Sequence, residues 1–207
     1  MRTVLCFGDS NTWGFDAATG GRLGRWQRWP GVLQRELGDE THVVEAGLNS
    51  RTTVFDLEGY SSSRSGLSAL PQTLETHAPV DVAVVFLGTN DLFVPGVDVQ
   101  AVAGGMRAVV ESALRSPWGP DDGPPRVLAI SPPPFGRLRD DWARECPSCV
   151  EASRHLGRAF ASTLAGLPCD LLDLTGVATP TPLDGIHFDA DQHDRIGLAV
   201  AGRLSER

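Results

Sequence analysis

The chain has 207 residues, of which 18 are basic and 26 are acidic, so its formal net charge is −8. Every basic residue is an arginine, and the sequence contains no lysine. The absence of lysine excludes Schiff-base enzymes, Ser-Lys dyads and P-loop nucleotide binding, because each needs a lysine amine. The acidic balance argues against a nucleic-acid partner, since phosphates are bound by basic surfaces. Chemistry based on serine, cysteine, histidine or carboxylates remains.

The first residues do not resemble a targeting segment. The apolar run Val4–Phe7 ends at Gly8, which is too short for the core of a signal peptide or for a membrane span. With 41% apolar residues, the length predicts one domain, residues 1–207, with its own core. We therefore expect a cytoplasmic protein that does not bind membranes. The sequence leaves open whether it forms a homo-oligomer.

Short apolar runs alternate with longer helix-compatible stretches along the chain. The expected strands are Thr3–Phe7, His42–Glu45, Val80–Leu87, Arg126–Ile130 and Cys169–Leu174. The expected helices are Trp29–Leu37, Ser65–His77, Val99–Arg115, Asp140–Leu164 and Asp189–Leu204. This alternation is typical of a parallel sheet covered on both faces. The predicted fold class is α/β, a three-layer α/β/α sandwich with a five-stranded parallel sheet.

Polar motifs follow the ends of several expected strands. They are Gly8–Asn11, Ala46–Asn49, Gly88–Asp91 and, after the last strand, Asp184–His187. In an open parallel sheet, ligands bind beyond the carboxyl ends of the strands. We therefore expect these motifs to meet at one edge and to form a catalytic site.

The residue types in these motifs predict nucleophilic catalysis by serine. Ser10 needs a base to take its proton, and His187 is the histidine at the expected edge. Asp184 lies three residues earlier and can accept the Nδ1 proton of His187, which fixes the tautomer that faces the serine.

The negative oxygen of the tetrahedral intermediate also needs donors. Gly47 offers a backbone N–H without a Cβ to block close approach, and Asn90 offers a side-chain amide. The backbone N–H of Ser10 is a third donor. Acyl transfer to Ser10 followed by attack of water is the expected reaction.

This pattern resembles the SGNH, or GDSL, hydrolase family. The matching blocks are Gly8-Asp9-Ser10, Gly47, Gly88-Thr89-Asn90-Asp91 and Asp184-Gly185-Ile186-His187. The resemblance implies a flavodoxin-like sheet and a triad of Ser10, His187 and Asp184. It also implies an oxyanion hole formed by Ser10, Gly47 and Asn90.

Within that family the chain is most similar to small bacterial arylesterases and acyltransferases, which share runs like Leu5–Ser10, Arg51–Thr53 and Ser131–Pro134. The resemblance implies a serine esterase that acts on short-chain acyl or aryl esters, with a small-molecule ester as its partner and no cofactor or metal. Two alternatives stay open. One is an acyltransferase that passes the acyl group to an alcohol, and the other is a catalytically silent binding module.

Four further residues are candidates for substrate binding. Asn11 stands where the family name expects leucine and could alter the acyl pocket. Trp13 and Phe15 could form an aromatic wall beside Ser10. Arg51 could contact a substrate carbonyl or tie down the oxyanion loop, and we favour the tie.

The four cysteines are expected to be reduced thiols. Cys6 and Cys169 lie in or beside apolar runs and are expected in the core. Cys146 and Cys149 have the spacing of a redox motif or of half a zinc site, but no second cysteine pair follows. A structural role is therefore predicted for this pair.

Overall fold

The computed structural model describes residues 1–205 and contains a five-stranded parallel sheet. The strands are β1 (Arg2–Gly8), β2 (Thr41–Gly47), β3 (Val82–Phe86), β4 (Arg126–Ser131) and β5 (Cys169–Asp173). They run in the order β2-β1-β3-β4-β5, and each neighbouring pair is parallel. This is the flavodoxin-like order, so the predicted fold class is confirmed.

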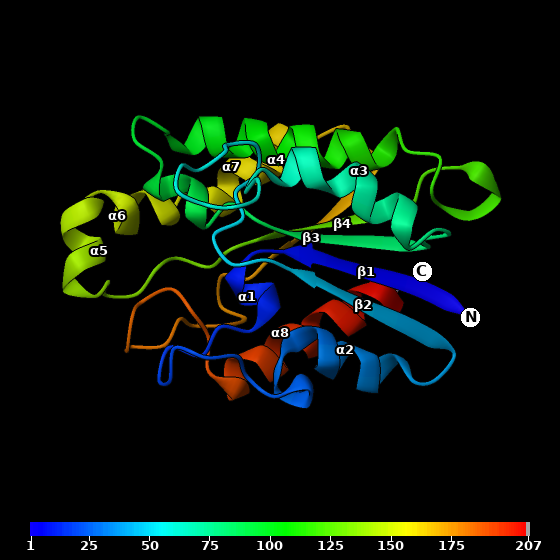
Figure 1. Cartoon of the computed structure of the whole chain (residues 1–207), viewed down its shortest axis with the longest axis horizontal. Helices are drawn as coiled ribbons and strands as arrows, with labels where there is room; N and C mark the ends of the chain where they lie inside the picture. Colours follow the sequence, from blue (N-terminus) through cyan, green and yellow to red (C-terminus); the bar gives the residue numbers. More distant parts are fainter. Residues whose placement is uncertain (206–207) are drawn as a thin grey trace.

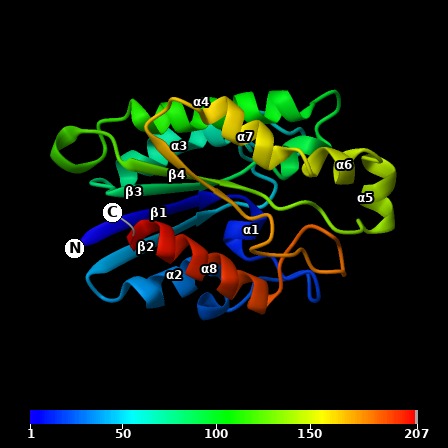
Figure 2. The same cartoon turned by 180° about the vertical axis from the view of Figure 1, so that it is seen from behind.

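Helices cover both faces of the sheet (Figures 1 and 2). One face carries α3 (Gly66–Thr76), α4 (Val99–Leu114) and α7 (Leu156–Leu164), and the other carries α2 (Trp29–Leu37) and α8 (Ala190–Ser205). Short 3-10 helices lie at η1 (Arg25–Gln27), η2 (Asn90–Phe93) and η3 (Pro120–Asp122). Among residues 1–205, no helix has both the length and the apolar character needed to cross a bilayer.

The central strand β1 shows how the sheet separates two hydrophobic cores. Leu5 and Phe7 pack in the core beneath α3, α4 and α7, whereas Val4 and Cys6 pack in the core beneath α2 and α8. Successive side chains of a strand point to opposite faces, so a continuous apolar run fits a sheet that is buried on both sides. The run ends at the edge of the sheet opposite the N-terminus (Figure 1).

The chain turns into a short helix, α1 (Ser10–Trp13), directly after β1. The sequence patterns did not predict this helix, because a single turn shows no hydrophobic period. The Asp9 carboxylate accepts a hydrogen bond from the Asn11 N–H and so caps the helix. Gly14 ends it at a φ of +86°, a conformation that favours glycine. The turn places Ser10 at the carboxyl end of β1.

The predicted long helix Asp140–Leu164 is wrong. The structure has three helices there, α5 (Asp140–Glu145), α6 (Cys149–Ser153) and α7. Pro147 explains the first break, since it lacks an N–H and its ring clashes with the preceding turn. Both α5 and α6 lie beyond the carboxyl edge of the sheet (Figures 1 and 2).

The expectation of four reduced cysteines is also wrong, because Cys146 and Cys149 form a disulfide. The turn between α5 and α6 brings their Cα atoms to 5.4 Å, within the usual range for a disulfide. Cys6 and Cys169 are free thiols, and burial raises the pKa of both. Cys6 is fully buried, as a core residue should be, whereas Cys169 is only partly buried.

Candidate active site

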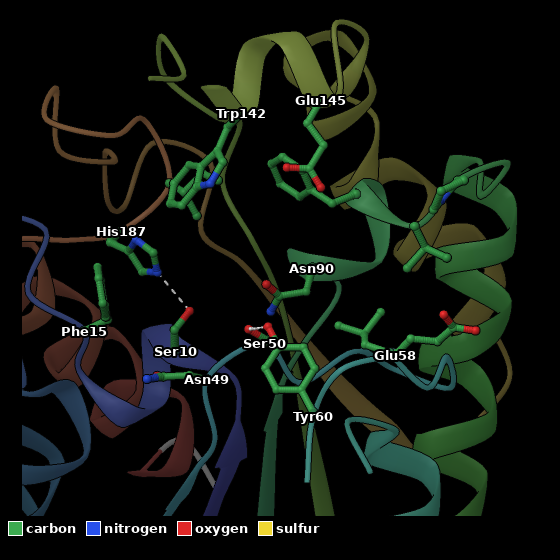
Figure 3. Close-up of a pocket in the computed structure, with 15 residues that line it drawn as sticks. Ser10, Phe15, Asn49, Ser50, Glu58, Tyr60, Asn90, Trp142, Glu145 and His187 are labelled. Atoms are coloured by element: carbon green, nitrogen blue, oxygen red, sulfur yellow. Dashed lines mark hydrogen bonds between the residues drawn. The ribbon is translucent and has the colours of Figure 1, made fainter. Parts of the chain in front are cut away.

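Ser10, His187 and Asp184 form a continuous chain of hydrogen bonds at the carboxyl edge of the sheet. The Nε2 atom of His187 lies 2.9 Å from Oγ of Ser10 (Figure 3). Its Nδ1 atom lies 2.7 Å from Oδ2 of Asp184. Ser10 comes from the start of α1, and the other two come from the turn before α8. All three side chains are largely buried. The structure thus brings together the nucleophile, base and orienting carboxylate that the sequence suggested.

The turn around Asp184 fixes the tautomer of His187. The Oδ1 atom of Asp184 accepts hydrogen bonds from the backbone N–H groups of Ile186 (2.9 Å) and His187 (3.0 Å). Burial raises the pKa of Asp184, but its hydrogen bonds with His187 and these backbone donors outweigh burial, so the pKa lies below its ordinary value. The ionised carboxylate accepts a hydrogen bond from Nδ1–H and leaves Nε2 free to take the proton of Ser10.

A cavity of about 600 Å³ opens beside Ser10 and His187. Two of its walls are aromatic. The centre of the Phe15 ring lies 4.4 Å from the centre of the His187 ring, and the centre of the Trp142 ring, on α5, lies 6.0 Å from the same point. Other lining residues are Asn49, Ser50, Leu57, Glu58, Tyr60, Asn90, Phe93, Val94, Pro95, Glu145 and Ile186. The volume and the mixture of apolar walls with a few polar groups suit a small-molecule site.

Gly47 does not line this cavity. A Cβ built on Gly47 would lie 2.2 Å from the backbone nitrogen of Trp13, so this glycine allows β2 to approach α1 closely. The residue that lines the cavity in this segment is Ser50, three positions later. Ser50 has a φ of +62°, and within residues 1–205 its N–H donates no hydrogen bond. The backbone N–H of Ser50 therefore replaces that of Gly47 as the candidate oxyanion donor.

Asn90 lines the cavity, as the sequence suggested (Figure 3). Its Nδ2 atom donates a 2.9 Å hydrogen bond to the carbonyl of Arg51, which fixes the orientation of the amide. Its other contact, with Oδ2 of Asp9, is 3.5 Å long and lies at the limit for a hydrogen bond. One amide hydrogen is thus held in place, and the other is available to a substrate oxygen.

Of the four pocket candidates, only Phe15 lines the cavity. Asn11 is buried, and the Trp13 ring lies under the guanidinium of Arg22, 5.0 Å from its centre. Arg51 is also buried away from the cavity and ties the loop to the ends of two strands. Its Nη1 atom donates to the carbonyls of Gly8 (2.7 Å) and Ala46 (2.5 Å). Burial lowers the pKa of Arg51 to about 10, so it stays charged at neutral pH.

Two carboxyl groups are buried behind the catalytic edge. Asp91 accepts hydrogen bonds from the N–H of Thr53 at 2.9 and 3.1 Å and also binds the Thr53 hydroxyl. Burial raises the pKa of Asp91 to about 6 and that of Asp9 to about 7. The hydrogen bond from Asn11 offsets only part of the effect at Asp9. Ionisation of Asp9 therefore opposes folding.

Asp9→Asn is expected to reduce the pH dependence of stability. The pKa of Asp9 rises from 3.8 to about 7 on folding, so between these values the folded state retains a proton that the unfolded chain loses. This group's contribution to stability therefore falls as the pH rises from about 4 to 7 and stays low above that range. Asparagine cannot ionise, yet it can still accept from the N–H of Asn11.

The measurement is the thermal unfolding temperature of wild type and variant at pH 5 and pH 8. The loss on going to pH 8 should be smaller in Asp9→Asn. Asp98→Asn is the matched control, because Asp98 is an exposed cap of α4 that accepts from the Ala101 N–H. An Asp9→Asn variant with the wild-type pH dependence would contradict the argument.

Residues 6–195 match the model of the GDSL-like lipase/acylhydrolase family. The chain belongs to this family. The match covers the segments that carry Ser10, Ser50, Asn90, Asp184 and His187. Among curated proteins compared by sequence, none matches the chain.

Solved structures with the same fold align along nearly the whole chain. A carbohydrate acetylesterase family member from Sinorhizobium meliloti is 37% identical, with a TM-score of 0.92, over 99% of this chain and 97% of that one. Another carbohydrate acetylesterase from that organism is 30% identical, with a TM-score of 0.92, over 99% of both chains. The aryl esterase of M. smegmatis is 32% identical, with a TM-score of 0.90, over 99% and 98%. This family member is accordingly a serine esterase, a carboxylic ester hydrolase of small-molecule esters.

Proposed function

We propose that this esterase works through an acyl-enzyme on Ser10, formed within one hydrolase domain that spans residues 1–207. His187 takes the proton of Ser10 as the hydroxyl attacks the ester carbonyl, and Asp184 stabilises the resulting imidazolium. His187 then gives the proton to the leaving alcohol oxygen. Water repeats the sequence on the acyl-enzyme and releases the acid. The observation that carries the proposal is the hydrogen-bonded chain from Asp184 through His187 to Ser10, which opens into a cavity.

The negative oxygen of each tetrahedral intermediate is stabilised by three N–H groups. They are the backbone N–H groups of Ser10 and Ser50 and the side-chain amide of Asn90. Ser10 is the first residue of α1, so its N–H has no partner within the helix. Donors that are fixed before the reaction stabilise the developing charge without reorganisation, which is the main source of their effect.

The substrates we propose are esters of short acyl groups, with acetyl esters first. One support is the similarity to structures described as a carbohydrate acetylesterase and an aryl esterase. Another is the cavity of about 600 Å³, which has to hold both the acyl and the alcohol part of an ester. Trp142 and Tyr60 lie on its walls, where flat faces suit an aryl group or a sugar ring.

A series of p-nitrophenyl esters of increasing acyl length tests this proposal. We expect kcat/KM to be highest for acetate or propionate and at least about tenfold lower for octanoate, a difference of roughly 1.4 kcal/mol in transition-state binding. With alcohol added to the assay, the amount of free acid measures hydrolysis, and the amount of new ester measures transfer of the acyl group to the alcohol. A preference for octanoate would contradict the short-chain proposal while leaving the esterase mechanism intact.

A further inference from the structure

Tyr60 lies on the wall of the catalytic cavity and is the only tyrosine in the chain. Its hydroxyl donates a 2.8 Å hydrogen bond to Oγ of Ser50. Figure 3 shows the two side chains joined beside Asn90 and Ser10. The ring is partly exposed, so burial in the core does not explain its position.

The backbone of Ser50 needs an explanation because serine rarely adopts a φ of +62°. Rotation to the ordinary negative φ would turn the Ser50 N–H and change the direction in which it points. A side-chain contact that exists only in the left-handed conformation would favour that conformation. Within residues 1–205, the hydrogen bond from Tyr60 is the only one that the Ser50 side chain makes.

The segment that carries Tyr60 is itself anchored to the oxyanion segment. The N–H of Thr52, two residues after Ser50, donates to the carbonyl of Arg64 at 2.9 Å. The guanidinium of Arg64 lies 4.3 Å from the centre of the Tyr60 ring, within the range of a cation–π contact. The Asp56 carboxylate also accepts from the Arg64 N–H at 2.8 Å. These contacts hold the phenol above Ser50.

We propose that Tyr60 is a positioning residue of the oxyanion hole, which acts by holding Ser50 in the conformation that presents its N–H to the substrate. The inference rests on the proposed acyl-enzyme mechanism and extends it by one residue. Tyr60 binds the side chain of Ser50, and the backbone N–H of Ser50 is the group that donates to the reacting oxygen in the proposed mechanism. Loss of the phenol hydroxyl should therefore weaken stabilisation of the transition state more than binding of the ester.

The test removes this hydrogen bond from either end, with Tyr60→Phe and Ser50→Ala, and then from both ends together. Each single variant should lower kcat for p-nitrophenyl acetate by about tenfold and change KM by less than about twofold. The decrease in kcat is smaller than the roughly 10²–10³-fold decrease caused by removing an oxyanion donor itself. The double variant should lose no more activity than the more impaired single variant, because both changes remove the same interaction. Ser61→Ala is the matched control, since it removes an exposed hydroxyl from the neighbouring residue.

A second measurement separates positioning from a general structural role. An acyl trifluoromethyl ketone adds reversibly to Ser10 and places a negative oxygen in the oxyanion hole. Its affinity should fall in Tyr60→Phe by the same factor as kcat/KM, while the affinity for the product acid stays unchanged. Thermal unfolding followed by circular dichroism identifies the temperature range in which both single variants are folded. Ser50→Ala removes the same hydrogen bond without altering the Tyr60 ring.

Several results would overturn the inference. They are a Tyr60→Phe enzyme with wild-type kcat and inhibitor affinity, a change confined to KM, or additive losses in the double variant. Ser10→Ala distinguishes these outcomes from a failure of the mechanism. If Ser10→Ala is inactive and Tyr60→Phe is unaffected, only the positioning role is wrong. If Ser10→Ala keeps its activity, the proposed mechanism is wrong, and the positioning role fails with it.

Discussion

Ser10→Ala is expected to lower kcat for p-nitrophenyl acetate by at least about 10⁴-fold. Without the hydroxyl no acyl-enzyme can form, and His187 retains only the possibility of activating water. The residual rate would come from the oxyanion donors and from binding, which remain in place. Since Ser10 is a small residue whose side chain contacts His187 at the cavity wall, the variant should fold normally.

Mass spectrometry of the intact chain checks this expectation most directly. After reaction with a labelled ester, the wild-type enzyme should carry an acyl group on Ser10, and the variant should carry none. Ser131→Ala is the matched control, because Ser131 is a fully buried serine at the end of β4 that does not line the cavity. Wild-type turnover by Ser10→Ala would remove Ser10 as the nucleophile.

The sequence was most informative where local chemistry and strand topology coincide. Each apolar run is bounded by glycine or polar residues, and in a parallel sheet those boundaries meet at one edge. Ser10 and Asn90 could be placed together for this reason, although 79 residues lie between them in the chain. The turn Asp184–His187 could be read locally, because a carboxylate three residues before a histidine can fold back onto it.

The parts that the sequence did not reveal depend on backbone conformation and on tertiary packing. Gly47 looked like the natural donor because it lacks a Cβ, but that space is filled by the backbone of α1. The residue type of Ser50 gave no indication of a positive φ. The only indication in the sequence was its place in a short polar turn after β2.

The cavity walls were equally hidden. Trp142 reaches His187 from α5, a short helix that ends before Pro147 and lies over the catalytic edge. Tyr60 belongs to a segment without hydrophobic periodicity, and its contact with Ser50 is visible only in the folded chain. Substrate-binding residues on irregular segments are positioned by the scaffold and not by a local pattern.

Asp184→Asn is expected to lower kcat by about 10⁴-fold while leaving the fold intact. The reason lies in how the Asp184 carboxylate is held. Its Oδ1 atom accepts from the N–H groups of Ile186 and His187, and an asparagine can satisfy both donors only by placing its own oxygen there. The amide nitrogen then faces Nδ1 of His187 and donates to it.

That reversal changes the tautomer of His187. With Nδ1 acting as an acceptor, the proton moves to Nε2, so the ring presents a donor to Ser10 and can no longer take its proton. Nitrogen-15 NMR of the imidazole should show the proton on Nδ1 in the wild type and on Nε2 in the variant, in step with the loss of kcat. Asp189→Asn is the control, because Asp189 lies close in sequence but accepts from the Gln192 N–H at the start of α8, a capping role that asparagine can keep. An Asp184→Asn enzyme with wild-type kcat would show that orientation of His187 by Asp184 is not needed for catalysis.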